Sequence, residues 1–311
     1  MTAQRDLIVV GGGAAGLAAA QYGARAGLDV LVLEQLASGG QALVIDSLEN
    51  YPGLSEPVSG FDFSQRMEQQ AVRFGVEIMN AAVSAIRRDG EIFTVETDRG
   101  PLAALAVVLA TGAKHRHLGV TGEQELAGRG VSYCATCDGP FFKGRRMLVV
   151  GGGDAACDEA MYLANLASSV LLVHRRGQLR AQKALADRTI ANPKIEVRFH
   201  TEVLRILGDK KVSAARLVDN TTGREYDEAT DSVFIFVGSI PQTAAVPEAR
   251  LDEAGYVVTD QRMETSIPGL FAAGDVRSTP FRQLVVAAAE GAVAAHAAGQ
   301  RIEALKGRAY A

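Results

Sequence analysis

Cysteine is scarce in this chain of 311 residues, and tryptophan is absent. Three cysteines are too few for a disulfide-stabilised scaffold, so a cysteine pair here needs another explanation. An excess of positive charge is also missing, because the net charge is -4 and the pI is about 5.8. No basic surface is therefore expected to attract nucleic acid or anionic lipid, and small molecules or proteins are the expected partners.

Long uninterrupted apolar segments are lacking as well. The run at residues 7–20 contains three consecutive glycines and follows Arg5 and Asp6, so we predict neither a targeting peptide nor a membrane span. The expected location is a reducing compartment, the cytoplasm, where a C-x-x-C pair is more often catalytic or metal-binding than structural. With 48% apolar residues, the chain is long enough for two domains, each with its own core.

One pattern occurs twice, at residues 7–34 and 146–174. In each copy an apolar β-rich segment precedes a glycine turn, an alanine-rich helix follows, and a second β-rich segment ends in a polar residue 23 positions after the first glycine. This context predicts a Rossmann-type unit, in which glycines let a pyrophosphate approach the backbone and the helix N-terminus. The turn residues are Gly11, Gly13 and Gly16 in the first copy and Gly151, Gly153 and Ala156 in the second.

Two such units predict two bound dinucleotides, and the polar residue after each second strand indicates which. Glu34 ends the first copy, and a carboxylate at this position accepts hydrogen bonds from ribose hydroxyls while repelling a phosphate. The second copy has His174 there, followed by Arg175 and Arg176, with Arg180 further on. These side chains are suited to the 2'-phosphate of NADP(H), so NADPH is predicted at the second unit.

Cys134 and Cys137 form a C-x-x-C pair directly before the second copy. A disulfide takes electrons through thiolate attack and release, so nicotinamide needs a mediator, and FAD at the first unit would serve because a flavin accepts a hydride and can reduce a disulfide. A zinc site that also uses His115 and His117 is the alternative for this pair. The third cysteine, Cys157, is expected to be a small buried hydrophobe.

Together with several short motifs, these features resemble the low-molecular-weight thioredoxin reductases, a group of the pyridine nucleotide-disulfide oxidoreductases, nearly from end to end. The most specific motif is CATCDG at residues 134–139. The others are GGQ (39–41), ENYPG (49–53), ATGA (110–113), HRR (174–176) with RA (180–181), FAAGDV (271–276) and RQ (282–283).

The resemblance implies an α/β fold of two Rossmann-like, three-layer dinucleotide-binding domains, with the NADPH domain inserted in the FAD domain. Residues 1–114 and 244–311 would form the FAD-binding domain, and residues 115–243 the NADPH-binding domain that carries the dithiol. The inserted domain would rotate about two glycine-containing crossings, at residues 112–119 and 238–243. The second crossing, GSIPQT, departs from the usual G-H-x-P-N-T at Ser239 and Gln242.

The resemblance also assigns roles within the dithiol. Cys137 would face the flavin, Cys134 would attack the substrate disulfide, and Asp138 would protonate the leaving thiolate. A simple turn-forming role is the alternative for Asp138, since Asp-Gly-Pro favours turns. The reaction implied is NADPH-dependent reduction of thioredoxin or a thioredoxin-like protein by a homodimer.

For the first domain, the resemblance places Asp275 beside the ribityl-pyrophosphate part of FAD and aims a helix beginning near Arg282 at the isoalloxazine. The remaining cofactor-binding residues that we predict are Ala15, Gly40, Gln41, Asn50, Gly112, Asp154, Ala155, Gly274 and Gln283. Three other activities stay open: a relative with a different electron donor, one that serves a glutaredoxin-like or peroxiredoxin-linked partner, and a flavin-binding redox sensor without turnover.

Overall fold

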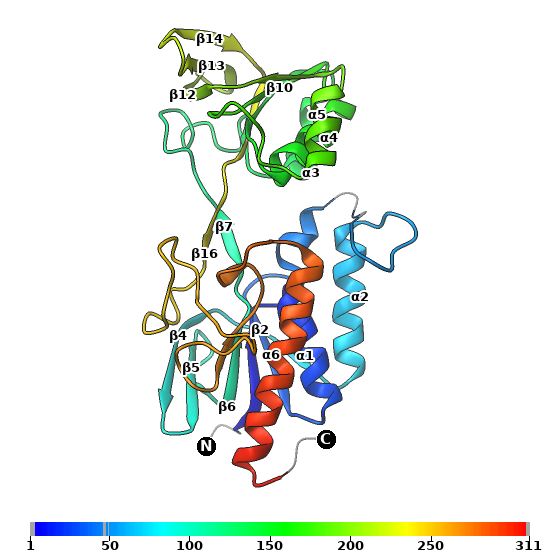
Figure 1. The fold of residues 1–311 in the computed structure, drawn as a ribbon, viewed down its shortest axis with the longest axis vertical. Coiled ribbons are helices and arrows are strands. Elements are labelled where there is room, and N and C mark those ends of the chain that lie inside the picture. Colours follow the sequence, from blue (N-terminus) through cyan, green and yellow to red (C-terminus); the bar gives the residue numbers. More distant parts are fainter. Residues whose placement is uncertain (1–3, 46–47, 49, 309–311) are drawn as a thin grey trace. The chain divides into compact units, whose positions relative to one another are not determined.

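The structure is a computed structural model that describes residues 4–45, 48 and 50–308, without the side chains of residues 44 and 137. The chain divides into two compact units (Figure 1). Unit 1 comprises Met1–Lys114 and Ile240–Ala311, and unit 2 comprises His115–Ser239. Where the chain passes between them, β7 (Ala113–His115) and β16 (Ser239–Pro241) pair as a two-stranded sheet.

Unit 1 contains a seven-stranded sheet in the order β3-β2-β1-β6-β5-β4, with β17 also pairing to β6. The pairs among β3, β2, β1, β6 and β17 are parallel, whereas β4, β5 and the first half of β6 are antiparallel. The strands are β1 (Arg5–Val10), β2 (Val30–Glu34), β3 (Glu77–Asn80), β4 (Val83–Asp89), β5 (Ile92–Thr97), β6 (Leu102–Leu109) and β17 (Leu270–Ala272).

Both faces of this sheet are covered, as expected for parallel strands that are apolar throughout. In β1, Leu7 and Val9 face one core, and Ile8 and Val10 face the other. Helices α1 (Ala14–Arg25), α2 (Gly60–Arg73) and α6 (Leu284–Leu305) lie side by side on the first face (Figure 1). The segment at residues 245–257 contributes to the core on the second face.

Unit 2 has a fully parallel five-stranded sheet in the order β11-β10-β9-β15-β8. Helices α4 and α5 pack on one face, and a three-stranded antiparallel sheet packs on the other, so three layers result. The elements are β8 (Val131–Ser132), α3 (Ala135–Asp138), β9 (Arg146–Gly151), α4 (Asp154–Leu166), β10 (Ser169–Val173), α5 (Lys183–Ala191), β11 (Ile195–Arg198), β12 (Thr201–Gly208), β13 (Val212–Asp219), β14 (Glu225–Ala229) and β15 (Ser232–Phe236).

These sheets confirm the α/β class with two Rossmann-like units. The first repeat forms β1, α1 and β2, and the second forms β9, α4 and β10. Three short 3-10 turns, at Gly40–Val44, Gly139–Phe142 and Gly274–Val276, come after β2, α3 and β17 in the chain. Cys157 is a fully buried residue of α4 with a free thiol in the core of unit 2, which confirms its prediction as a buried hydrophobe.

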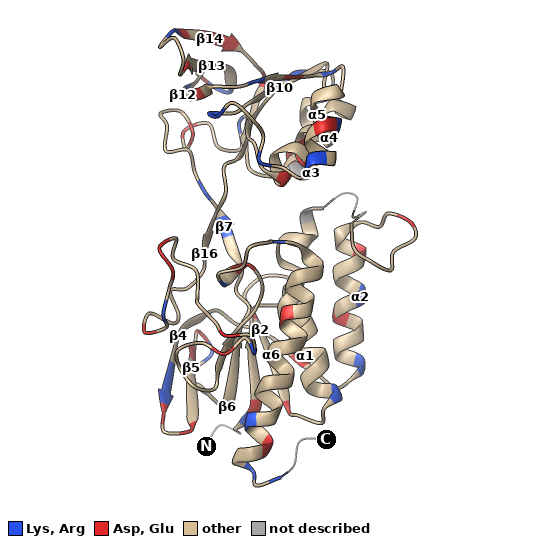
Figure 2. Cartoon of the chain, viewed as in Figure 1, with Lys and Arg blue, Asp and Glu red and all other residues tan. Residues whose placement is uncertain are grey.

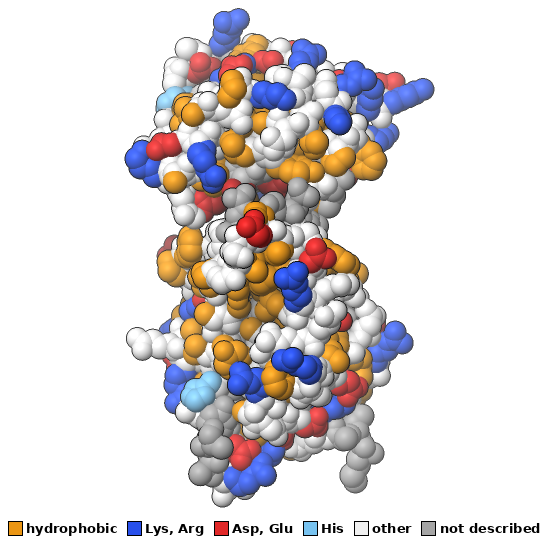
Figure 3. Space-filling model, turned by 90° about the vertical axis from the view of Figure 1, so that its right-hand side faces the viewer, with side chains coloured by type: hydrophobic (Ala, Val, Ile, Leu, Met, Phe, Trp, Pro, Cys, Tyr) orange, Lys and Arg blue, Asp and Glu red, His pale blue; other side chains and the backbone are white. Residues whose placement is uncertain are grey.

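Helix α6 is alanine-rich, and its charged side chains are confined to one acidic position in its N-terminal half and to the C-terminal end (Figure 2). On the face drawn in Figure 3, acidic and basic side chains are interspersed over both units. Among the residues that the structure describes, no helix has the length and apolar character needed to cross a membrane.

Small residues let α1 and α6 approach closely. A Cβ added to Gly291 of α6 would lie 2.0 Å from the carbonyl oxygen of Ala15 in α1. Since that neighbour is backbone, it cannot move aside as a flexible side chain would. The contact also holds α1, which follows the first glycine turn, against the rest of unit 1.

We predict that Gly291→Ala destabilises the protein by about 1–3 kcal/mol, because the added methyl group would force α1 and α6 apart. Urea unfolding monitored by circular dichroism measures the change. Val293→Ala is the control on the same helix, since Val293 is 40% exposed and its truncation should change stability by no more than about 0.5 kcal/mol. Equal stability of Gly291→Ala and the wild type would contradict this account of the helix pair.

Candidate functional site

The first glycine turn joins β1 to α1 and packs tightly against the backbone that follows β6. Gly11 has a φ of +106°, and a Cβ there would lie 2.3 Å from the carbonyl oxygen of Ala110, just after β6. A Cβ on Gly16 would lie 1.8 Å from the carbonyl oxygen of Gly11. At Gly13, the N-cap residue of α1, no atom lies within 4 Å of the place where a Cβ would be, and the helix has no side-chain cap from this residue. The backbone therefore faces open space at Gly13, where a phosphate could approach the helix N-terminus.

Glu34 lies at the end of β2, beside this turn. Its Oε2 accepts the backbone N–H of Gly12 at 2.7 Å, and its Oε1 accepts that of Leu36 at 2.9 Å. These two bonds fix the carboxylate in place, and each oxygen keeps a further lone pair for a ligand hydroxyl. The geometry is compatible with the ribose contact expected from the sequence.

Other predicted residues of unit 1 are brought together from distant parts of the chain. The side chain of Gln41 donates to the carbonyl oxygen of Ala113 at 3.1 Å, and that of Asn50 donates to Oε1 of Gln283 at 2.9 Å. Gln283 is the N-cap of α6, but its side chain does not cap the helix. The side chain of Gln283 therefore does not compete with a ligand for the first N–H groups of α6, where the predicted contact with a flavin lies.

Three further predicted residues of unit 1 lie in helix α1, in a 3-10 turn and in the first crossing. Ala15 is buried in the first turn of α1, and Gly40 begins the 3-10 turn that follows Gly39, whose N–H donates to Gly12 O at 2.7 Å. Gly112 has a φ of +67° at the start of the first crossing.

A buried acid that sequence reasoning missed supports the turn after β17. Glu290 of α6 is 7% exposed, accepts the N–H of Gly274 at 2.8 Å and forms an ion pair with Arg277. Because the pair is nearly enclosed, removal of one partner would leave a buried charge. In the sequence, a single acidic residue within the alanine-rich segment VVAAAEGAVAA was the feature that could have indicated this buried role of Glu290.

Asp275 follows Gly274 and is half-buried. Burial raises the pKa of its carboxyl group; the charge of Arg282 opposes this shift, and that of Glu290 adds to it. Arg282 itself stacks over the ring of Tyr256, with 4.1 Å from its guanidinium carbon to the ring centroid. Ionisation of Asp275 is therefore less favourable in the folded protein than in the unfolded chain.

The second glycine turn repeats the packing of the first. A Cβ on Gly151 would lie 2.5 Å from the carbonyl oxygen of Phe236, whereas Gly153, the N-cap of α4, again faces open space. Asp154 begins α4, and its carboxylate accepts the backbone N–H of Gln182 at 2.7 Å. Ala155 is exposed in the same first helical turn.

The basic loop after β10 lies against this turn. Its side chains at Arg175, Arg176 and Arg180 are exposed, and the N–H of Arg180 donates to Gly152 O at 2.6 Å. His174 is 6% exposed, and its Nε2 has no hydrogen-bond partner among the described residues. Burial, then the charge of Arg180, lowers the pKa of His174, so a neutral ring is expected at pH 7.

Cys134 directly precedes the short helix α3 and is disulfide-bonded. The side chain of Cys137 lies outside the described part of the structure, so its pairing with Cys134 stays a prediction. Asp138 is half-buried at the end of α3, and its N–H donates to Cys134 O at 3.2 Å. This bond closes the C-x-x-C segment into a single turn.

The histidines considered for a zinc site have other contacts. His117 Nδ1 lies 2.6 Å from the hydroxyl of Tyr133, which in turn donates to Oε1 of Glu123 at 2.6 Å. Glu123 is 1% exposed, and burial together with this acid raises the pKa of Tyr133. No group of three or more His, Cys, Asp or Glu side chains suited to a metal occurs in the described part of the chain, which leaves out the side chain of Cys137.

The departures in the second crossing have a structural role. Gln242 donates its N–H to Gly112 O at 2.9 Å and its side-chain amide to Thr111 O at 2.5 Å. The hydroxyl of Thr111 donates to Gln242 O at 2.7 Å. Gln242 therefore ties the second crossing to the segment that follows β6.

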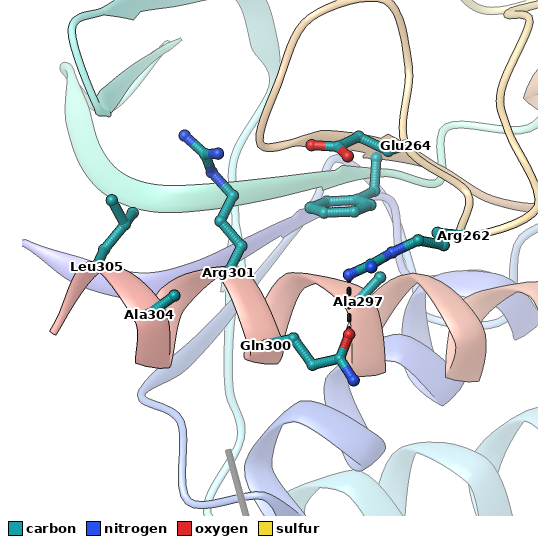
Figure 4. Close-up of a pocket in the computed structure, with 8 residues that line it drawn as sticks. Arg262, Glu264, Ala297, Gln300, Arg301, Ala304 and Leu305 are labelled. Carbon is teal, nitrogen blue, oxygen red and sulfur yellow. Dashed lines mark hydrogen bonds between the residues drawn. The ribbon is translucent and has the colours of Figure 1, made fainter. Parts of the chain in front are cut away.

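A cavity of about 550 Å³ lies beside the C-terminal half of α6 in unit 1 (Figure 4). Arg262 donates to Oε1 of Gln300 at 2.8 Å within it. The lining residues are Arg262, Glu264, Phe271, Ala297, Gln300, Arg301, Ala304 and Leu305, none of which was predicted as a site residue.

Two Rossmann-like units, each with an uncapped helix behind a glycine turn, and a disulfide-bonded cysteine before the second turn define a dinucleotide-dependent disulfide oxidoreductase. Residues 5–291 match the family described as pyridine nucleotide-disulphide oxidoreductase. This chain belongs to that family.

Similar proteins match the chain over nearly its whole length. A curated thioredoxin reductase of Treponema pallidum is 51% identical over 98% of this chain and 100% of its own length. The crystal structure of Lactococcus lactis thioredoxin reductase is 39% identical, covers 96% of this chain and 99% of its own, and has a TM-score of 0.93. That of T. acidophilum thioredoxin reductase is 36% identical, covers 97% and 99%, and has a TM-score of 0.91.

We predict that Asp275→Asn stabilises the FAD-free protein at pH 7. A carboxyl group whose pKa is raised by folding binds its proton more tightly in the folded state, so stability falls as the pH rises from the unfolded pKa to the folded pKa. The amide cannot ionise and avoids this loss. Urea unfolding at several pH values should show an advantage of the variant that shrinks as the pH is lowered.

Asp252 supplies a control, because folding shifts its pKa in the direction opposite to that of Asp275. Burial acts to raise its pKa, but hydrogen bonds from Ser278 and the backbone outweigh burial and lower the pKa overall. Asp252→Asn should therefore be destabilising at pH 7, with a loss that disappears as the pH falls through the folded pKa. The same pH dependence in both variants would refute the assignment of the Asp275 shift to its buried position.

Proposed function

We propose that this protein is an NADPH-dependent flavoprotein disulfide reductase that passes electrons from NADPH, through FAD and the Cys134–Cys137 dithiol, to thioredoxin or a thioredoxin-like protein. The observation that carries the proposal is the disulfide-bonded cysteine of the CATCDG motif, which precedes the second glycine turn in the sequence, in a chain 51% identical to a thioredoxin reductase throughout. Unit 1 would bind FAD, and unit 2 would bind NADPH.

The residues of unit 1 fit FAD. Gly13 leaves room for a pyrophosphate at the uncapped N-terminus of α1, and Glu34 is fixed where a ribose hydroxyl could donate to it. The uncapped N-terminus of α6 would stabilise negative charge on a reduced flavin. Asp275 would accept a hydrogen bond from the cofactor. Ligand binding would then explain why the fold retains a carboxylate whose ionisation is unfavourable there.

The residues of unit 2 fit NADPH in the same way. Gly153 leaves room at the uncapped N-terminus of α4. The exposed guanidinium groups of Arg175, Arg176 and Arg180 would bind the 2'-phosphate, and the bond from Arg180 N to Gly152 O keeps this loop beside the turn. The buried Nε2 of His174 has no described partner and would gain one from the ligand.

When bound, FAD accepts a hydride from NADPH and supplies two electrons to a disulfide. The chain itself provides the thiol chemistry. Cys134 would attack the substrate disulfide, Cys137 would resolve the mixed disulfide, and Asp138 would supply the proton for the leaving thiolate. The hydrogen bond from Asp138 N to Cys134 O keeps the acid on the same turn as both thiols.

We also propose that the protein is a homodimer that acts in the cytoplasm, as the resemblance implies. Multi-angle light scattering of the purified holoenzyme measures its mass directly, and a value near 32.8 kDa would refute the dimer.

The test of the electron path is the variant Cys137→Ser. It should lose thioredoxin reduction, yet NADPH should still bleach the flavin absorbance, because hydride transfer precedes the thiol step. Anaerobic titration followed by a steady-state assay with thioredoxin measures both. Retained turnover in this variant would refute the proposed path, and a wild type that bleaches with NADPH but reduces no dithiol protein would favour a redox sensor.

The donor assignment predicts that replacement of both Arg175 and Arg176 by Ala raises the KM for NADPH by about a hundredfold, with a much smaller effect on NADH. Each charge-assisted contact with the phosphate contributes about 1.5–3 kcal/mol. FAD content should be unchanged. Arg188→Ala is the control, since this exposed arginine lies on α5 of the same unit, outside the basic loop.

If the double variant kept the wild-type preference for NADPH over NADH, the second dinucleotide site would be assigned wrongly. A wild type with no such preference would point instead to a different electron donor.

A further inference from the structure

The sulfur of Cys134 has a hydroxyl neighbour within its own turn. Its Sγ lies 3.4 Å from Oγ1 of Thr136, within the range of a hydrogen bond to sulfur. Because Cys134 is disulfide-bonded, its sulfur carries no hydrogen, and Thr136 must be the donor. The mechanism outlined above makes no use of this hydroxyl.

Hydrogen bonds hold the backbone around this contact. The hydroxyl of Ser132 accepts the N–H of Cys134 at 3.0 Å and donates to its carbonyl oxygen at 3.1 Å. Ser132 is 4% exposed, and the N–H of Asp138 reaches the same carbonyl oxygen. None of these bonds involves the disulfide, so they remain available when the disulfide opens.

The intervening residue is anchored as well. The hydroxyl of Tyr133 donates to Glu123, whose carboxylate also accepts the N–H groups of Leu118 and Gly119 at 2.9 and 2.6 Å. This buried carboxylate thus fixes the segment that leads into Cys134. The backbone that leads into Cys134 and carries its sulfur is therefore held by hydrogen bonds.

We propose that Thr136 is a further catalytic residue, whose hydroxyl donates a hydrogen bond to Sγ of Cys134 and stabilises the thiolate that attacks the substrate disulfide. The proposal rests on the proposed function, because it assigns the attacking thiolate to Cys134. A hydrogen bond to the charged form of a thiol favours that form, and the thiolate is the nucleophile in disulfide exchange.

The exchange itself balances without further reactants. The Cys134 thiolate attacks one sulfur of the substrate disulfide, which forms a mixed disulfide and releases one substrate thiolate. The Cys137 thiolate then attacks Sγ of Cys134, which restores the Cys134–Cys137 disulfide and releases the second substrate thiolate. Two electrons pass from the enzyme dithiol to the substrate, and the two protons of that dithiol end on the two substrate thiols.

The direct test measures the acidity of Cys134 in the FAD-loaded Cys137→Ser protein, where no internal disulfide can form. The rate of alkylation by iodoacetamide is followed against pH, and mass spectrometry confirms that Cys134 is the modified residue. Adding Thr136→Val removes the hydroxyl but keeps the branched shape, whereas adding Thr136→Ser keeps the hydroxyl. Thr136→Val should raise the midpoint by about 0.5–1 pH unit, a three- to tenfold loss of thiol acidity, and Thr136→Ser should leave it near the parent value.

An unchanged midpoint in the Thr136→Val protein, or an equal rise with Thr136→Ser, would overturn the proposal. With Cys137 restored, Thr136→Val should lower kcat/KM for thioredoxin several-fold, Thr136→Ser should restore it, and NADPH should bleach the flavin equally in both. Failure of the proposed function is distinguishable, because the wild type would then not reduce thioredoxin whatever the alkylation midpoints are.

Discussion

Close backbone contact at glycine is the constraint on which the rest of this structure depends. At Gly11, Gly16 and Gly151 a side chain would collide with a carbonyl oxygen of the turn itself or of a neighbouring strand. Only without these side chains can a helix start directly above the carboxyl ends of the parallel strands. The same turns leave Gly13 and Gly153 open, so a packing requirement and a binding surface arise from one short sequence.

Buried acids then hold the parts of the site that lie far apart in the sequence. Glu290 binds Gly274 and Arg277 beneath the N-terminal half of α6, and Glu123 binds Tyr133 and two N–H groups before the dithiol turn. A carboxylate can accept several hydrogen bonds at once, which suits it to fix irregular backbone inside a protein. Both acids thus act on loops, where function is concentrated, rather than on the sheets.

The site also contains groups that are unfavourable for folding by themselves. Asp275 is held with a raised pKa, and Nε2 of His174 is buried without a described partner. Proteins commonly retain such groups where a ligand completes their interactions. In this family the ligands are dinucleotides, and the two groups lie beside the two turns that would hold them.

The sequence by itself determined the two Rossmann repeats, because glycine spacing and apolar strands are local requirements that any chain with this fold must meet. It also determined the C-x-x-C pair and the contrast between Glu34 and His174 at equivalent positions. Only the tertiary structure decided that Asn50 meets Gln283, that Gln242 binds Thr111, and that Glu290 and Glu123 are buried. Thr136 was also beyond sequence reasoning, since a threonine hydroxyl can point in several directions. Such contacts depend on how separate segments pack, and no local pattern in the chain specifies that packing.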